Sequence, residues 1–198
     1  MKLSQEEQAL IKALQNPKTQ ERAFSTLVEQ YQERLYWHIR KIVLTHDDTH
    51  DVLQNTFIKI FRYIRKFKGD SKLHTWMYRI AYNESVGFLR TKQNTLQLQD
   101  GAFADYLLNN LQQDIYFDGD QAQLKLQQAI LKLSPKQARV FQMKYFEDLK
   151  FSEISKILDT SEGALKASYH HAVKKLKHLI HVQEVLVPLE TIHIENPN

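Results

Sequence analysis

The stretch LKFSEISKILDTSEGALKASYHHAVKKL, residues 149–176, contains two amphipathic segments separated by a short turn. Its apolar residues recur every three or four positions, as the buried face of a helix requires. A short helix, a tight turn at residues 159–161 and a longer helix predict a helix-turn-helix. The expected inner face consists of Ile154, Ile157, Leu158, Leu165, Tyr169, Ala172 and Leu176.

The second helix of this pair is basic and lacks acids. Residues 163–183 hold four Lys and four His but no Asp or Glu. A helix that faces only water usually interleaves acids with its lysines for paired interactions, so the composition favours a polyanion such as DNA. The N-terminal half of such a helix reads base edges while its lysines meet phosphates. The candidate DNA contacts are Lys166, Ala167, Ser168, His170, His171, Lys174 and Lys175.

Histidine pairs also raise the possibility of a metal site. His170 and His171 are adjacent, so on a helix they point about 100° apart and chelate one ion poorly. His46 and His50 share a helical face beside carboxylates, which fits either metal-dependent hydrolysis or the acidic first turn of a capped helix. The chain has no cysteine, no glycine-rich phosphate loop and no HExxH or GxSxG motif. We therefore expect no metal, no cofactor and no catalytic residues, and a protein that is not an enzyme.

The distribution of charge divides the chain into blocks. The net charge is +4 over 198 residues. Residues 59–92 contain nine Lys or Arg against two acids, whereas residues 93–122 contain five Asp and no Lys or Arg. This alternation indicates two anion-facing modules with an acidic connector. We expect a first domain at 1–92, a linker at 93–122 with room for one short helix, a second domain at 123–181 and a tail at 182–198.

Helices are expected throughout, because only five Gly and four Pro punctuate the chain. We predict an all-α fold of two small helical domains. In the first, a short helix near residues 4–15 precedes three long helices, and the loop at 67–72 is followed by a fresh helix cap. Trp76 is expected in the core, whereas Tyr78 and Tyr82 stay open between a core role and stacking on bases. No apolar run is long enough to span a bilayer, which favours a cytoplasmic protein.

Two sets of motifs resemble one family. DVLQNTFIKIF (51–61), FKGDSKLHTWMYRIAYN (67–83) and GFLR (87–90) resemble the second conserved region of bacterial RNA polymerase sigma factors of the extracytoplasmic-function (ECF, group IV) type. LSPKQARVFQMKYFEDLKFSEISKILDTSEGALKASYHHAVKKL (133–176) resembles the fourth region. The order and separation also match. The tail at 182–198 lies beyond the resemblance.

The resemblance implies roles for named residues. Asp51, Gln54 and Asn55 match positions that dock on the clamp helices of the polymerase largest subunit. The part that captures the nontemplate strand of the minus-ten element corresponds to Lys68, Asp70, Ser71, Lys72, Tyr78, Arg79, Tyr82 and Asn83. The basic helix matches the reader of the minus-thirty-five element, but Ser168 and His171 stand where relatives usually carry Arg. Arg makes bidentate contacts to guanine that Ser and His cannot make, so the base preference does not transfer.

The resemblance further implies a monomeric promoter-specificity factor. Its expected partners are core RNA polymerase, promoter DNA and an anti-sigma factor, which in this family is often membrane-bound, with no small-molecule substrate. An ordinary helix-turn-helix regulator that binds duplex DNA is the alternative from another class. The acidic linker has two open interpretations, an imitation of phosphates within a polymerase channel and a plain solvated connector.

Overall fold

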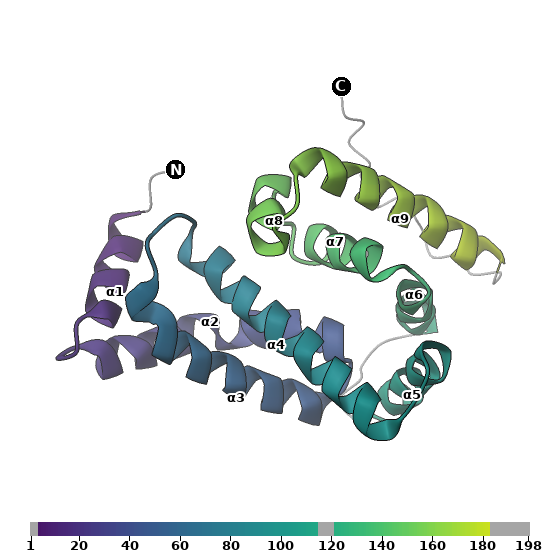
Figure 1. The fold of residues 1–198 in the computed structure, drawn as a ribbon, viewed down its shortest axis with the longest axis horizontal. Helices are drawn as coiled ribbons and strands as arrows, with labels where there is room; N and C mark the ends of the chain where they lie inside the picture. The colour runs from purple at the N-terminus through teal and green to yellow at the C-terminus, as the bar shows by residue number, and fades with distance from the viewer. Residues whose placement is uncertain (1–3, 115–120, 183–198) are drawn as a thin grey trace.

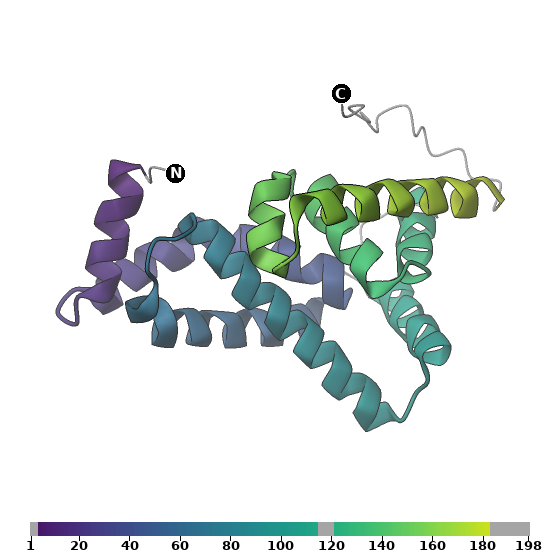
Figure 2. The same ribbon diagram turned by 45° about the horizontal axis from the view of Figure 1, so that its top comes forward.

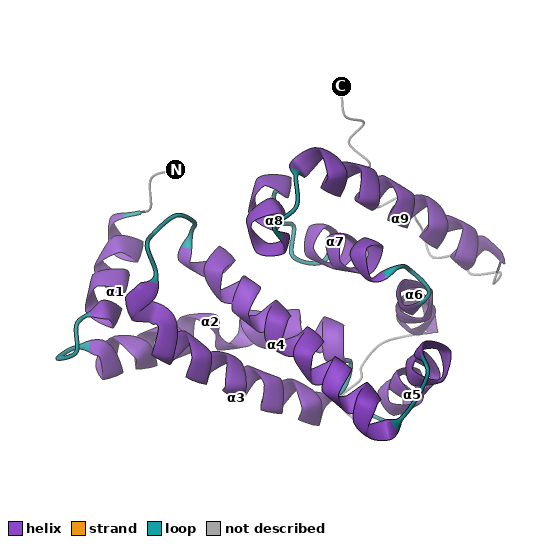
Figure 3. Cartoon of the chain, viewed as in Figure 1, coloured by secondary structure: helices purple, strands orange, loops and turns teal. Residues whose placement is uncertain are grey.

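The computed structural model describes residues 4–114 and 121–182, and every regular element in these ranges is helical (Figures 1 and 3). This confirms the predicted all-α class. No helix among the described residues is both long and apolar enough to cross a membrane. In chain order the elements are α1 (Gln5–Gln15), α2 (Gln20–Val43), α3 (His46–Tyr63), the 3-10 helix η1 (Ile64–Lys66), α4 (Leu73–Leu96), α5 (Asp100–Gln113), α6 (Gln121–Leu131), α7 (Pro135–Tyr145), α8 (Phe151–Leu158) and α9 (Glu162–Val182).

The first domain is built from α1 to α4. Helices α2, α3 and α4 pack against one another, and α1 packs on α2. The apolar periodicity of each long helix supplies the core, in which the side chains with no solvent exposure include Leu14, Leu27, Leu35, Ile39, Ile60, Ile64, Leu73 and Met77. Trp76 is half-buried against this core, as predicted.

The start of α4 is stabilised by a residue from another helix. The N-cap position, Lys72, makes no side-chain capping bond. Instead, the backbone N–H of Leu73 donates to Oε1 of Glu7 at 2.7 Å. A carboxylate suits this place because the first N–H groups of a helix lack partners and carry partial positive charge. The local cap expected after the 67–72 loop is therefore replaced by a tertiary cap from α1.

The second domain consists of α6 to α9 and contains the predicted helix-turn-helix. Ser134 caps α7 by accepting from the N–H of Gln137, whose side chain accepts from the Ser134 N–H in return. Helix α8 ends at Leu158, and the φ of 50° at its C-cap residue Asp159 turns the chain toward α9. Every residue of the predicted inner face is buried or half-buried. The core of this domain includes Ala129, Ile130, Phe141, Ala172, Val173, Leu176 and Ile180.

The connector contains more structure than expected. Helix α5 spans 14 residues, and Phe103, Leu107 and Leu111 on one of its faces are buried together with Leu44. Many of the polar residues around this apolar face are uncharged Asn and Gln, so the amphipathic pattern of the helix is weak in the sequence. At its end Asp114 accepts from Nη2 of Arg40 at 3.0 Å and from the N–H of His46 at 2.7 Å. The Asp114 carboxylate therefore ties the end of α5 to the first domain. Residues 115–120 lie outside the described ranges.

The two domains lie against each other. Helix α8 contacts α4, and the two views agree that α7 and α8 sit beside the first domain rather than apart from it (Figures 1 and 2). One apolar cluster crosses the boundary: Val140, Met143, Leu149 and Ile154 pack in the same core as Met77, Tyr78 and Tyr82. We name residues 139–156 the α7–α8 corner. Nothing in the sequence pattern predicted this contact.

Candidate nucleic-acid interface

The outer face of α9 is open to solvent. Its inner residues Leu165, Ala172 and Leu176 are buried against the second domain. The predicted DNA contacts lie on the opposite side: Ser168 is half-buried, and the exposed residues are Lys166, Ala167, His170, His171, Lys174 and Lys175. The structure therefore brings the seven predicted residues together on one helix. Six of them are exposed to solvent.

Lysines of this face differ in what they already contact. Lys175 donates from Nζ to the backbone carbonyl of Lys132 at 2.7 Å, which ties it to the C-terminal end of α6. The rings of His170 and His171 lie 6.1 Å apart and nearly perpendicular, as neighbouring helical positions require. Such divergent rings present separate hydrogen-bonding groups and do not converge on one ion.

The predicted contacts on α4 divide into two pairs with opposite exposure. Arg79 and Asn83, one helical turn apart, are exposed. Tyr78 and Tyr82, one turn apart on the adjacent face, retain only 2% and 6% exposure. In this arrangement the two rings cannot reach DNA, because the α7–α8 corner covers them. Their open assignment from the sequence is resolved here in favour of burial at the domain boundary.

Burial of the two tyrosines is accompanied by specific contacts. The Tyr78 ring stacks on the His38 ring at 4.7 Å, and the guanidinium of Arg139 lies over the Tyr82 ring at 5.5 Å. Burial raises the pKa of Tyr82 to about 12. It also raises the pKa of Tyr78, with a further contribution from the charge of Glu147. Both hydroxyls are therefore uncharged at physiological pH.

The loop before α4 is also in contact with the second domain. Lys68 and Asp70 are exposed at its tip, and Ser71 and Lys72 are half-buried. The ammonium of Lys72 lies 3.2 Å from the Glu153 carboxylate, and Lys156 donates to the backbone carbonyl of Asp70 at 2.8 Å. The loop is thus positioned beside α4 as the sequence predicted, but part of its polar surface is already occupied by α8.

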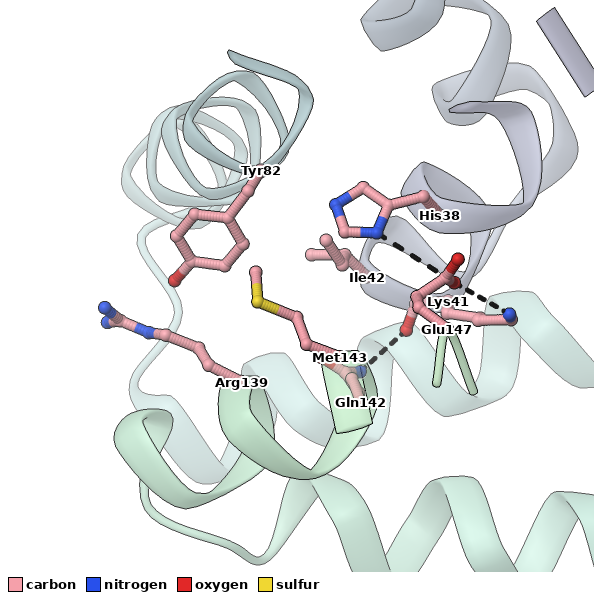
Figure 4. A pocket seen from close by; sticks show the side chains of 8 residues that line it. All are labelled: His38, Lys41, Ile42, Tyr82, Arg139, Gln142, Met143 and Glu147. Atoms are coloured by element: carbon pink, nitrogen blue, oxygen red, sulfur yellow. Dashed lines mark hydrogen bonds and ion pairs between the residues drawn. The ribbon is translucent and has the colours of Figure 1, made fainter. Parts of the chain in front are cut away.

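A second ionic group lies at the other end of the α7–α8 corner (Figure 4). The carboxylate of Glu147 accepts from Nζ of Lys41 at 2.9 Å, and its Oε1 is 3.9 Å from Nδ1 of His38. Although this carboxylate favours a protonated His38, desolvation dominates and lowers the pKa of the imidazole to about 4. The ring is therefore neutral at pH 7. Sequence reasoning missed His38, Glu147 and Glu153, and only their mutual contacts distinguish them from other charged residues.

The predicted polymerase-docking residues lie on α3. Asp51, Gln54 and Asn55 are all exposed on its solvent side. Beside them, a groove between α2 and α3 is lined by Gln54 together with Phe24, Val28, Phe57, Ile58, Phe61 and Arg62. An apolar groove with a polar margin is the usual form of a protein-binding surface. Phe24 and Phe57 lie on the apolar faces of their helices, but helical spacing alone does not show that both are only half-buried.

The segment around His46 and His50, which the sequence offered as an alternative metal site, forms the start of a helix. The rings of His46 and His50 lie edge to face with centroids 4.4 Å apart, and the hydroxyl of Tyr36 is 2.8 Å from Nδ1 of His46. Within residues 4–114 and 121–182, no three His, Cys, Asp or Glu side chains are arranged to hold a metal ion. His46 instead begins α3, and the interpretation as an acidic helix start accounts for the segment.

Two family matches cover the two domains. Residues 27–95 match Sigma-70 region 2, and residues 123–176 match Sigma-70, region 4. The RNA polymerase sigma-H factor of Pseudomonas aeruginosa is 26% identical over 180 residues, which are 87% of this chain and 92% of that protein. The ECF RNA polymerase sigma factor SigW of Bacillus subtilis is 29% identical over 164 residues, which are 78% of this chain and 87% of that protein.

Solved structures share the fold. CnrH, in complex with the cytosolic domain of CnrY, superposes with a TM-score of 0.64 at 19% identity, covering 89% of this chain and 97% of CnrH. The sigma factor RpoE from Bartonella quintana, in complex with the anti-sigma factor NepR, gives 0.62 at 18% identity, covering 80% and 97%. At these identities the likeness concerns the arrangement of helices.

Proposed function

Because this chain belongs to the sigma-70 family of RNA polymerase sigma factors and is of the ECF type, we propose that it directs the polymerase to two-part promoters through named residues of its two domains. Sigma factors serve promoter recognition and transcription initiation, and the helix-turn-helix of region 4 is the DNA-binding element. An independent duplex-binding regulator is not favoured, since it would not require region 2. Members of the family are generally non-enzymatic, so the polymerase performs the chemistry.

The observation that carries the proposal is the exposure of two separate candidate surfaces on one chain. Region 2 presents Asp51, Gln54 and Asn55 beside an apolar groove, which suits docking on polymerase. Region 4 presents the basic outer face of α9, which suits the major groove of the minus-thirty-five element. A factor with both surfaces bridges polymerase and DNA, whereas a factor with only one does not.

Recognition of the minus-ten element is assigned to the 67–72 loop and α4. Lys68 and Lys72 supply positive charge for the strand backbone, and Arg79 and Asn83 lie on the exposed face of α4. The Asn83 amide both donates and accepts hydrogen bonds, as contact with an extruded base demands. Tyr78 and Tyr82 join this surface only when the second domain moves away from α4.

At the minus-thirty-five element, Lys166, Ser168, His170 and His171 are assigned to base edges and Lys174 to phosphate. An imidazole offers two ring nitrogens for hydrogen bonding, whereas the guanidinium of Arg offers five donors. We therefore expect this factor to prefer upstream bases other than those favoured by relatives that carry Arg at the same positions.

The proposal includes partners and location. Two structural relatives are described as complexes with another protein, CnrY or the anti-sigma factor NepR. By analogy, an anti-sigma factor is proposed to bind this chain, and fractionation of cells tests whether that partner is membrane-bound. The factor is proposed to act as a monomer in the cytoplasm, where core polymerase and promoter DNA reside.

Reconstitution with purified core polymerase tests the function. The wild-type chain is expected to copurify with core polymerase and to support transcription from a promoter selected with the holoenzyme. Gln54→Ala is expected to weaken the association, because Gln54 borders both the polar residues and the groove. Gln30→Ala, at an exposed glutamine on α2, serves as the control. If the chain binds duplex DNA but not polymerase, the sigma assignment of its activity is wrong.

A further inference from the structure

Helix α1 makes hydrogen bonds to both ends of the 67–72 loop. At the start of the loop, Nε2 of Gln15 donates to the backbone carbonyl of Phe67 at 2.8 Å. Where the loop enters α4, Oε1 of Glu7 accepts from the backbone N–H of Leu73 at 2.7 Å. The two side chains lie about two turns apart on α1, which runs beside the loop (Figure 1). One helix therefore sets the separation between the two ends of the loop.

Each of the two side chains suits the backbone groups that it meets. The end of a helix leaves carbonyls without partners, and the Gln15 amide donates to the carbonyl of Ile64 in η1 at 3.3 Å as well as to that of Phe67. The start of a helix leaves N–H groups without partners and favours negative charge, and Glu7 supplies a carboxylate there. Both side chains are half-buried, so water competes only in part for these contacts.

Between its two ends the loop has little structure of its own. Among the described residues, 68–71 make no backbone–backbone hydrogen bond. Gly69 has a φ of 78°, in the left-handed region that favours glycine, and turns the chain at the tip. Lys156, which donates to the backbone carbonyl of Asp70, belongs to the second domain, whereas α1 and the loop belong to the same domain. Within that domain, the conformation of the loop depends on where α1 holds its ends.

We propose that α1 positions the minus-ten loop, and that Glu7 and Gln15 are positioning residues that set the base preference of the loop without touching DNA. The proposal rests on the proposed function, since the loop is the one assigned to the minus-ten element. An extruded base is read by hydrogen bonds to its edge, and these weaken steeply when donor and acceptor are misaligned. A loop whose ends are loose presents its polar groups less precisely. Such a loop distinguishes the bases less well.

Substitutions on α1 test the two contacts in the full-length chain. Glu7→Ala removes the acceptor for the start of α4, and Glu6→Ala is its matched control, because Glu6 is the preceding residue and is exposed. Gln15→Glu removes the donor at nearly constant size, and Gln5→Glu adds the same charge at an exposed position of α1. Glu7→Gln is the rescue variant, since its amide oxygen accepts the same hydrogen bond without the charge.

Amide hydrogen exchange of the free chain reports one of the contacts directly. The Leu73 N–H is bonded to the Glu7 carboxylate, so its exchange requires that this bond opens. We expect Glu7→Ala to speed the exchange of this amide roughly tenfold over the wild type, and Glu6→Ala to leave the rate unchanged. Equal exchange rates in the two variants would show that Glu7 does not hold the end of the loop, and would overturn the proposal.

Base preference is measured with the holoenzyme on a promoter DNA library that is randomised in both elements. For Glu7→Ala and Gln15→Glu, the ratio between the preferred base and the next best at the minus-ten position read by the loop is expected to fall roughly tenfold. Glu6→Ala and Gln5→Glu should keep this ratio, and Glu7→Gln should recover most of it. Ratios at the minus-thirty-five element should stay unchanged in every variant, because that element is assigned to α9.

The library also separates positioning by α1 from the proposed function. If Glu7→Ala and Gln15→Glu lower binding of all library members in proportion, or behave like their controls, the two residues only support the fold and the positioning role is wrong, while the function stands. If the wild-type holoenzyme selects no minus-ten sequence, the proposed function is wrong and the positioning role falls with it. Should Glu7→Ala lose its helical circular dichroism, Gln15→Glu against Gln5→Glu decides the question with the same expectations.

Discussion

Acidification is expected to destabilise this protein through His38. The imidazole is 3% exposed and faces Glu147 from the α7–α8 corner, Lys41 from its own helix and the Tyr78 ring from α4. Desolvation lowers its pKa from 6.5 to about 4 in the folded chain. Between these values the unfolded chain binds a proton that the folded chain does not bind. Stability therefore rises with pH in that window.

The magnitude follows from the two pKa values. One pKa unit corresponds to about 1.4 kcal/mol, so the contribution of His38 is fully present above pH 6.5 and about 3 kcal/mol of it is lost by pH 4. Between pH 7.5 and pH 5 the expected loss is about 2 kcal/mol. Because His38 is almost fully buried, solvent screening does not reduce this figure substantially.

Urea unfolding at a series of pH values measures the effect. Both tryptophans, Trp37 and Trp76, lie in the first domain, so their fluorescence reports the unfolding of the domain that contains His38. The variant His38→Asn does not titrate and is expected to lose about 2 kcal/mol less than the wild type between pH 7.5 and 5. His178→Asn, at an exposed position on α9, should follow the wild type. Parallel curves for wild type and His38→Asn would refute the reasoning.

Four further substitutions have definite expectations. Lys174→Ala should weaken duplex binding by the holoenzyme for all sequences and reduce the slope of log affinity against log salt concentration by roughly one. His171→Ala should instead alter which upstream bases are accepted. A comparison of binding across a duplex library measures both effects. Asp114→Asn leaves the buried Arg40 without a carboxylate and should lower the free energy of unfolding by about 3 kcal/mol. Ser134→Ala removes the capping box of α7 and should cost about 1 kcal/mol in the same urea assay.

Helix positions and their inner faces were available from the sequence because they depend on local spacing. Ser134 and Pro135 indicate the start of α7, and the alternation of Ile154, Ile157 and Leu165 with polar residues indicates the helix-turn-helix. These signals lie within a few turns of each other, so no distant contact is needed to interpret them. For the same reason the outer face of α9 was predicted correctly as an exposed surface.

Local spacing in the sequence could not predict contacts between residues that are far apart in the chain. The cap on Leu73 comes from Glu7, 66 positions away, and the partner of Lys41 is Glu147, 106 positions away. Helix α5 was underestimated because its apolar face becomes informative only when Leu44 completes the cluster. The apolar groove beside Gln54 was missed because helical period indicates an apolar face without indicating what covers it.

Tyr78 and Tyr82 mark the boundary between what the sequence determined and what the tertiary structure decided. The sequence alone determined that both lie one turn apart on an amphipathic helix beside basic residues. A tyrosine has an apolar ring and a polar hydroxyl, so the same sequence is compatible with burial in a core, packing at a domain boundary or stacking on bases. Only the packing of the α7–α8 corner against α4 decided that in this structure they are buried, since burial depends on which surfaces meet and local spacing carries no such information.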